Sequence, residues 1–481
     1  MLIKRLKDFG KDASLYGMSQ IVGQLIGFFL IPIYTTYLTP TDYGVMTLLG
    51  FYTLFYSPLS HLGFQGAMFR FVGLSKTMEE ETSFISTAVK AVLVISVVFS
   101  FFSQAFVGIL EKTLLNSQEH TLLLIITIWG ALPASLSQFG YSLLRVKRKV
   151  QTIFWLNNFN LILSIGLNVW FIVGLKMGLM GITLAGAISG IVAFLSVWYF
   201  AKIPLNWEFD RFKFNKMAKY GLPNVPHYLI AIVMMFFGQY MVNRMLSPAE
   251  LGLYAIAWKF CLPLTAIVGI VHSSWSAYKY DLIRTDEHSK DTLGKFVLLM
   301  ISFYSMLYII LVVMGPYVLE IMANSSFHKA GSYITFLALI PLFNGIYHSL
   351  GSGISLSERQ YLMPAISALG CGVSIGASFL LIPHFGIPGA GISTAIGWAI
   401  MAILGLFYGQ SNFRINFDLN RIFLLVFICL VSLLVFQFTS FLLFQKLLIS
   451  VGFLFLTILI LPKKDLISVK SLIISKIKKT E

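Results

Sequence analysis

Long runs of apolar residues, separated by short polar stretches, recur along the whole 481-residue chain. A helix that crosses the hydrocarbon core of a bilayer needs ~17–25 mainly apolar residues. The runs predict fourteen membrane-spanning helices. These spans cover residues 14–38, 43–71, 83–110, 120–144, 152–175, 177–200, 220–245, 250–276, 295–319, 331–356, 361–383, 386–410, 422–444 and 447–462.

The composition supports the same fold class. The chain is 57% hydrophobic and 11% charged, and its mean hydropathy is +0.82. A globular protein carries about 25% charged residues, and a soluble chain of this size could not bury so much apolar surface. We therefore expect an all-α polytopic membrane protein. The net charge of +15 then indicates basic cytoplasmic loops rather than a nucleic-acid partner.

The distribution of basic residues tests the number of spans. With the N-terminus placed in the cytoplasm, most of the 35 Lys and Arg residues fall on the cytoplasmic side. Lys90 and Lys259 fall inside spans. The opposite face holds five, which are Lys112, Lys176, Arg244, Lys329 and Lys446. This asymmetry predicts cytoplasmic N- and C-termini.

One short turn occurs twice, 208 residues apart. "LTPTDYG" occupies residues 38–44 and "LSPAELG" occupies residues 246–252, while "SLYG" (14–17) is matched by "AKYG" (218–221). Six spans separate the copies, so both turns lie on the same face, which indicates a parallel repeat. The expected organisation is an N-terminal lobe (1–209, spans 1–6), a C-terminal lobe (210–413, spans 7–12) and two extra spans with a basic tail (414–481).

These features resemble a known family. Fourteen spans arranged as six, six and two, together with "YLTPTDYG" and "LGFQGAMFRF" (62–71), are similar to Wzx-type flippases of the multidrug/oligosaccharidyl-lipid/polysaccharide exporter (MOP) superfamily. The resemblance implies that the chain moves an undecaprenyl-pyrophosphate-linked oligosaccharide repeat unit across a bacterial inner membrane by alternating access. The product would serve O-antigen, capsule or exopolysaccharide assembly. A polysaccharide polymerase and a chain-length regulator are the implied protein partners, and a monomer is expected.

The sign of the charge within the spans bears on the substrate. All twenty acidic residues fall in loops, span ends or tails, whereas a cation-coupled drug exporter normally needs a carboxylate within the membrane. Lys90 and Lys259 lie about eight and nine residues into spans three and eight. They are predicted to line a central cavity and attract the pyrophosphate. The alternative is that their long side chains reach the interface.

Further candidates for substrate binding are cations at span ends and polar stripes. Arg70 and Arg244 end spans two and seven, and either is also a natural interfacial anchor. Polar residues repeat at i, i+4 on one helix face, where they face sugars or pack against a neighbouring helix. The polar and aromatic candidates are Gln24, Tyr56, His61, Gln65, Gln239 and Asn243.

Other classes find less support in the sequence. The chain has no P-loop and no catalytic spacing of carboxylates or of nucleophile and base, so we expect no enzyme, in particular no glycan polymerase or ligase. His227, His272 and His348 fall in different spans, and the three cysteines lie in apolar runs. We therefore expect no metal and no cofactor. A lipid II flippase and a cation-coupled multidrug exporter of the same superfamily remain as alternatives.

Overall fold

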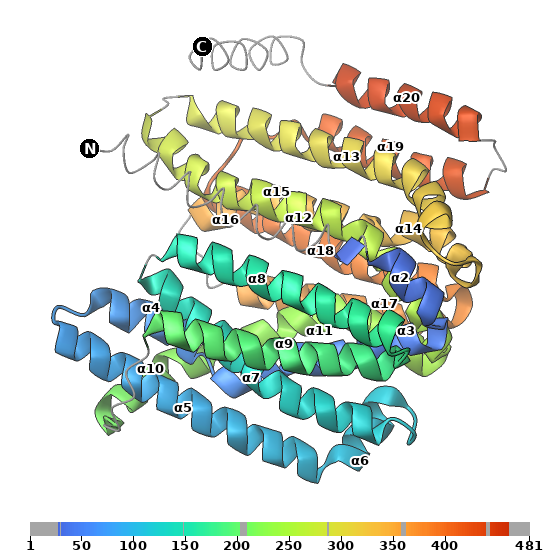
Figure 1. The fold of residues 1–481 in the computed structure, drawn as a ribbon. Coiled ribbons are helices and arrows are strands. Elements are labelled where there is room, and N and C mark those ends of the chain that lie inside the picture. Colours follow the sequence, from blue (N-terminus) through green and yellow to red (C-terminus); the bar gives the residue numbers. More distant parts are fainter. Residues whose placement is uncertain are drawn as a thin grey trace, which may run out of the picture. The chain divides into compact units, whose positions relative to one another are not determined.

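The computed structural model describes residues 27–28, 30–147, 149–202, 209–285, 288–356, 362–438 and 443–460 (Figure 1). These residues contain helices and no strand, which confirms the predicted all-α fold. The chain divides into two compact units, Met1–Ala255 (unit 1) and Ile256–Glu481 (unit 2). The predicted lobe boundary at residue 209 and the separate C-terminal pair of spans stay predictions.

Unit 1 contains the helices from α2 to α11 and the start of α12. They are α2 (Ile31–Tyr37), α3 (Pro40–His61), α4 (Phe64–Leu74), α5 (Met78–Ala105), α6 (Val107–Leu110), η1 (Glu111–Leu115), α7 (Thr121–Val146), α8 (Val150–Val169), η2 (Trp170–Gly174), α9 (Gly178–Ala201), α10 (Arg211–Gly221), η3 (Leu222–Asn224), α11 (Val225–Met245) and α12 (Pro248–Thr285).

Unit 2 contains the rest of α12 and the helices that follow it. They are α13 (Ser289–Met322), η4 (Ser325–Ala330), α14 (Gly331–Leu337), α15 (Leu339–Leu350), α16 (Ser352–Leu356), α17 (Leu362–Phe385), α18 (Ile387–Asn412), α19 (Leu419–Phe438) and α20 (Leu443–Ile460).

Eleven helices in the described part of the chain are long and apolar enough to cross a membrane. The predicted first span falls largely on residues outside that part. The predicted second span is divided between α3 and α4, and the fourteenth corresponds to α20, whose apolar stretch is the shorter Gln445–Thr457. The count of fourteen therefore stays a prediction.

The break in the second span has a defined backbone geometry. Leu62 and Gly63 both adopt left-handed conformations, with φ of 44° and 76°, which end α3 and start α4 in a new direction. A Cβ built on Gly63 would lie 2.1 Å from the carbonyl oxygen of Gly221. Only a glycine permits so close an approach of two backbones, and this approach joins α4 to the end of α10.

Small residues let the spans of each unit pack closely. In unit 1, α9 packs along both α7 and α8 (Figure 1), and Gly130 of α7 lies against Ala187 of α9. In unit 2, α18 packs along α15 and α17, where Gly353 of α16 also approaches Gly409. Helices in a bilayer associate through such van der Waals contact, because lipid gives little hydrophobic drive between them.

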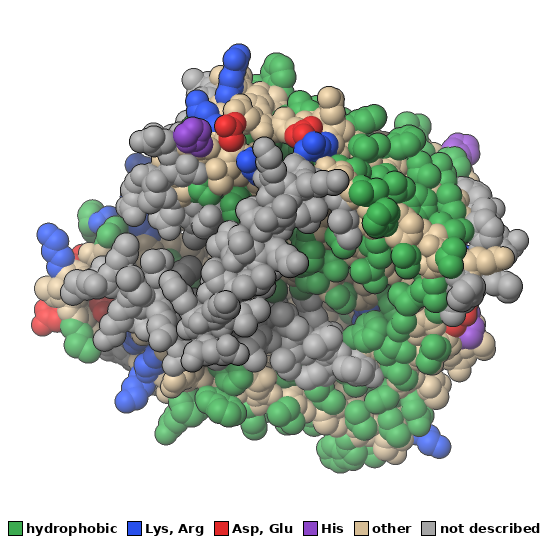
Figure 2. All heavy atoms as spheres, turned by 90° about the horizontal axis from the view of Figure 1, so that it is seen from above, with side chains coloured by type: hydrophobic (Ala, Val, Ile, Leu, Met, Phe, Trp, Pro, Cys, Tyr) green, Lys and Arg blue, Asp and Glu red, His purple; other side chains and the backbone are tan. Residues whose placement is uncertain are grey.

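The surface is that of a membrane protein. Hydrophobic side chains cover much of the described part of the face in Figure 2, and charged side chains gather toward its margins. Large apolar side chains are exposed on several spans, including Trp155 of α8 and Leu380 of α17, each 70% exposed. In water such faces would drive association, whereas lipid solvates them.

Candidate functional site

The end of α11 that is predicted to lie outside is fastened to the segment between α6 and α7. Arg244 donates from Nη1 to the Asn116 Oδ1 atom at 2.6 Å and from Nε to the Tyr240 hydroxyl at 3.2 Å. Tyr240 donates in turn to the Thr113 carbonyl oxygen at 3.2 Å. The predicted substrate residue Arg244 thus contributes to a contact within unit 1.

Two further predicted residues lie close to Arg244 on the same helix. Gln239 and Asn243 are each 2% exposed. Asn243 donates to the Leu114 carbonyl oxygen at 3.4 Å. The Asn243 Oδ1 and Gln239 Nε2 atoms have no hydrogen-bond partner among the described residues. Buried amide groups without a hydrogen-bond partner are rare and energetically costly. These two atoms can therefore form hydrogen bonds with water or with a glycan hydroxyl.

The polar residues of the second span contact neighbouring helices. Tyr56 donates to the Ser96 carbonyl oxygen of α5 at 2.8 Å. His61 is 2% exposed, and its Nε2 atom lies 3.0 Å from the carbonyl oxygen of Ser135 on α7 and 2.9 Å from its hydroxyl. Gln65 hydrogen-bonds Ser142 on α7. In this conformation the three side chains join neighbouring helices, which is one of the two roles that the sequence allows for such stripes.

Arg70 lies at the end of unit 1 that is predicted to be cytoplasmic. Its guanidinium carbon sits 4.7 Å from the ring centroid of Tyr220 on α10. Lys216 of α10 places its ammonium 5.1 Å from the Phe71 ring centroid. These cation–π contacts run in both directions, because each helix offers a cation to an aromatic ring of the other. They hold α10 against α4.

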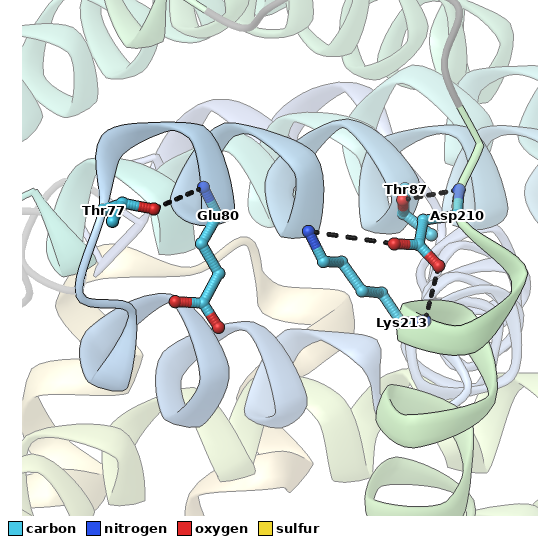
Figure 3. Close-up of polar contacts among 5 residues, drawn as sticks. All are labelled: Thr77, Glu80, Thr87, Asp210 and Lys213. Carbon is cyan, nitrogen blue, oxygen red and sulfur yellow. Dashed lines mark hydrogen bonds and ion pairs between the residues drawn. The ribbon is translucent and has the colours of Figure 1, made fainter.

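The start of α10 is also fixed to α5 (Figure 3). Asp210 accepts a hydrogen bond from the Lys213 amide at 3.0 Å, and its own amide donates to the Thr87 hydroxyl at 3.3 Å. Thr77 caps α5 by accepting from the Glu80 amide. An Asp or Thr at the N-cap accepts a hydrogen bond from a first-turn backbone amide that has no partner within the helix. The sequence therefore specifies both helix starts locally.

A cavity of about 790 Å³ lies at the ends of α8 and α9, and a second of about 770 Å³ lies beside the start of α5. The second cavity is lined by Thr77, Met78, Glu79, Glu80, Thr82, Ser83, Ser86 and Lys213. Lys90 follows Ser83 and Ser86 at the helical spacing i+7 and i+4, so it lies on the same face of α5, one turn deeper. Lys90 is half-buried.

Lys259 belongs to unit 2, near the middle of the apolar stretch Pro248–Ser273 of α12, and is half-buried between buried apolar neighbours. Lys90 and Lys259 thus occur one in each unit. Gln24 lies outside the described residues. The cavity predicted between the lobes, and the meeting of these lysines in it, stay predictions.

Unit 2 contains a polar cluster that the sequence reasoning missed. The imidazole rings of His272 on α12 and His348 on α15 stack with centroids 4.0 Å apart. Farther along α12, Trp275 donates to the Ser352 hydroxyl at 2.8 Å and Lys279 to the Ser355 hydroxyl at 2.6 Å, and both serines lie on α16.

The helical spacing of this cluster could have revealed it. Residues 272, 275 and 279 share one face of α12, and residues 348, 352 and 355 have helical spacing across α15 and α16. Burial lowers the pKa of Lys279, which lies beyond the apolar stretch of α12, to about 8.

No group of three or more potential metal ligands occurs among the described residues, and the side chain of His227 lies outside them.

The comparisons with known proteins decide the family. A model of the polysaccharide biosynthesis protein family matches residues 9–278. The chain belongs to this family. No curated protein matches the sequence.

Solved structures share the fold of this polysaccharide biosynthesis protein. A lipid II flippase MurJ in an inward closed conformation is 17% identical, with a TM-score of 0.73 over 95% of this chain and 99% of that one. An inward-facing multidrug resistance MATE transporter of the MOP superfamily is 15% identical, with a TM-score of 0.60 over 85% and 99%. A Vibrio cholerae MATE transporter, VcmN, in a bent form is 15% identical, with a TM-score of 0.56 over 84% of this chain and 97% of that one. The chain is therefore a multi-pass membrane protein that shares the fold of these transporters, and the family match confirms the resemblance.

Proposed function

We propose that this protein is a flippase for a lipid-linked oligosaccharide. It moves an undecaprenyl-pyrophosphate-linked repeat unit from the cytoplasmic to the outer leaflet of a bacterial inner membrane, and the product enters O-antigen, capsule or exopolysaccharide assembly. The N- and C-termini lie in the cytoplasm, and a polymerase and a chain-length regulator receive the product. The glycan and pyrophosphate cross between two lobes that rock, while the lipid tail stays in the membrane.

The sign of the charge within the spans carries this proposal. Lys90 lies twelve residues after the start of α5, and Lys259 lies eleven residues after the start of α12, so each sits ~16–18 Å along its helix. An ammonium at such depth costs ~2.5–3.5 kcal/mol or more unless it meets water or an anion. A pyrophosphate supplies that anion, and lysine binds it as a point charge.

The acidic residues support the same choice. In the described candidate spans, acidic side chains occur near helix ends, as with Glu80 in the first turn of α5 and Glu320 in the last turn of α13. A transporter of cationic drugs needs negative charge deeper in the membrane. The family match to polysaccharide biosynthesis and the fold shared with a lipid II flippase agree with an anionic, lipid-linked substrate. An enzymatic role has no support in these neighbours.

Depletion of the protein in its host is the direct test. We expect one polyprenyl-pyrophosphate oligosaccharide to accumulate, and face-specific labelling followed by mass spectrometry should find it on the cytoplasmic leaflet. Accumulation on the outer leaflet would instead place the defect after flipping. Unchanged lipid-linked glycans combined with higher sensitivity to cationic drugs would support the drug exporter and overturn the proposal.

Complementation of the depleted host then tests the two lysines. Lys90→Ala and Lys259→Ala should restore little export, and Lys259→Arg should restore more than Lys259→Ala because it keeps the charge. Lys112→Ala is the matched control, since Lys112 is exposed near the other end of the span that holds Lys90. Full export with Lys259→Ala would remove Lys259 from the substrate path.

A lipid II flippase is the second candidate, because a flippase of lipid II is similar along almost the whole chain. The two functions differ in what they rescue. Expression of this protein in cells that lack their own lipid II flippase should fail to restore growth if the substrate is an oligosaccharide repeat unit. Restored growth would favour lipid II.

A further inference from the structure

The cavity of about 790 Å³ at the ends of α8 and α9 lies within unit 1, away from the residues assigned to substrate. Its walls are the first turn of α8 and the last turn of α9. Residues that line it are Lys149, Val150, Gln151, Thr152, Tyr199, Phe200 and Lys202. The Lys149 ammonium donates to the Phe200 carbonyl oxygen at 3.3 Å, which ties the two helix ends together across the cavity.

The cavity has an excess of positive charge. Lys149 and Lys202 both line it, and Lys147 precedes Lys149 by two residues. Burial lowers the pKa of Lys147, Glu81 opposes that effect, and the charge of Lys149 reinforces it. Lys147 thus has Glu81 as a counter-charge, whereas Lys149 and Lys202 line the cavity with no acidic residue beside them in its lining, so a bound anion would be attracted to these two lysines. The open amides of the first turn of α8 add a weaker attraction for negative charge.

Exposed apolar side chains lead away from the same cavity. From Gln151, the exposed stripe of α8 continues through Trp155, Phe159 and Ile162 at helical spacing. On α9 the corresponding stripe runs through Leu195 to Tyr199, which is 78% exposed. In the most apolar stretch of α8 only 17% of the residues are buried. The surface is thus basic at one end and apolar along its length, which matches a lipid with a phosphate headgroup.

We propose that this cavity binds the phosphate of an anionic phospholipid in the predicted cytoplasmic leaflet, with the acyl chains along the exposed stripes of α8 and α9. Basic cavities between membrane helices on the cytoplasmic side suit such headgroups. Lys202 and Lys149 contact the phosphate, and Tyr199 covers it at the interface. This site is separate from the proposed binding site of the transported substrate. The proposal therefore does not depend on the proposed flippase function.

Binding of phosphatidylglycerol to the purified full-length protein tests the site. The protein is reconstituted in phosphatidylcholine nanodiscs, and phosphatidylglycerol is titrated in and counted by native mass spectrometry. Each removed charge should weaken binding about fivefold, from ~1 kcal/mol per basic residue. Lys202→Gln therefore weakens it about fivefold. Gln151→Glu places a carboxylate at an exposed position in the cavity and weakens binding without removing any of the contacts described above.

The same hairpin provides a matched control. Lys176 lies at the other end of α8 and α9, is exposed, and has a left-handed backbone (φ 54°) like Lys202 (φ 48°). Lys176→Gln should leave phosphatidylglycerol binding unchanged, and Lys202→Arg should restore it. Equal losses in Lys176→Gln and Lys202→Gln would show general surface attraction and overturn the site, as would wild-type binding in Gln151→Glu.

Competition experiments identify the source of the phosphate. Inorganic phosphate at the same concentration should not displace phosphatidylglycerol, because it gains nothing from the apolar stripes. Displacement by inorganic phosphate would reduce the site to a free-anion site and overturn the lipid assignment. Displacement by undecaprenyl phosphate at much lower concentration would overturn the phospholipid assignment in favour of a polyprenyl lipid.

Discussion

Gly44 and Gly252, which occupy the same position in the two copies of the repeated turn, pack reciprocally within unit 1. A Cβ on Gly44 would lie 1.9 Å from the Pro248 carbonyl oxygen, and a Cβ on Gly252 would lie 1.8 Å from the Pro40 carbonyl oxygen. Each glycine follows the proline of its own turn by four residues, so the two contacts are related by the repeat. The turn is repeated because each copy supplies the surface on which the other packs.

Substitution of either glycine should disrupt this contact. A real Cβ cannot approach a carbonyl oxygen so closely, so Gly44→Ala and Gly252→Ala force the starts of α3 and α12 apart. We expect each variant to lose about 1–3 kcal/mol of stability, seen as a lower unfolding temperature in detergent. The double variant should lose less than the sum of the two, because both substitutions open the same contact.

Gly50 is the control for that experiment. It lies within α3, is exposed, and would place its Cβ in open space. Gly50→Ala should therefore leave stability unchanged or raise it slightly, by up to about 1 kcal/mol, since alanine favours a helix. Equal losses for Gly44→Ala and Gly50→Ala would contradict the role of the contact.

Arg70 and Tyr220 should behave as a coupled pair. Arg70→Gln and Tyr220→Leu each remove the cation–π contact between α4 and α10. A double-mutant cycle on thermal unfolding should give a coupling energy of about 0.5–1 kcal/mol. A coupling energy of zero would show that the contact between Arg70 and Tyr220 does not stabilise the protein. Tyr220→Phe keeps the ring face and should retain most of the coupling.

His61 should affect stability and transport together. Its ring is buried against Ser135 and lies edge-on to Phe139, with ring centroids 5.7 Å apart. His61→Leu removes the hydrogen bonds of the imidazole to Ser135, whose hydroxyl keeps Ser60 as a partner at 2.7 Å, and should cost about 0.5–1.5 kcal/mol. Export should then fall only as far as the amount of folded protein falls. A loss of export at unchanged stability would instead place His61 at the substrate.

The sequence predicted the fold class well, because apolar runs of span length and basic residues gathered on one side are typical of helices that cross a membrane. It missed the break in the second span. Leu62 there is apolar and adopts a left-handed backbone, and local sequence gives no turn signal for such a residue. The contact of Gly63 with Gly221 joins residues far apart in the chain, so only the tertiary structure reveals it.

The candidate site was predicted less completely. The pattern of polar residues identified the helix faces of His61, Gln65 and Gln239, but helical spacing alone cannot show whether a face meets a cavity or a neighbouring helix. In the sequence, His272 and His348 of unit 2 fall in different spans, and nothing in their spacing pairs them. Their pairing depends on the packing of α12 against α15, which brings His272 and His348 together.

Lys279 gives a prediction about pH. Burial lowers its pKa from 10.5 to about 8 in the folded protein. Between these two values the unfolded chain binds more protons at this position than the folded protein, so stability rises with pH across that window. Below pH 8 the lysine is charged in both states, and the folded protein bears the cost of the buried charge.

Lys279→Met removes that cost. The variant should be more stable than the wild type at pH 7, by at most about 3 kcal/mol, and the difference should shrink as the pH rises from about 8 to about 10.5. Thermal unfolding in detergent at a series of pH values measures it, with Lys112→Met at an exposed position as control. A difference between wild type and Lys279→Met that stays constant from pH 7 to pH 10.5 would contradict the prediction, because loss of the Ser355 hydrogen bond alone does not depend on pH in this range.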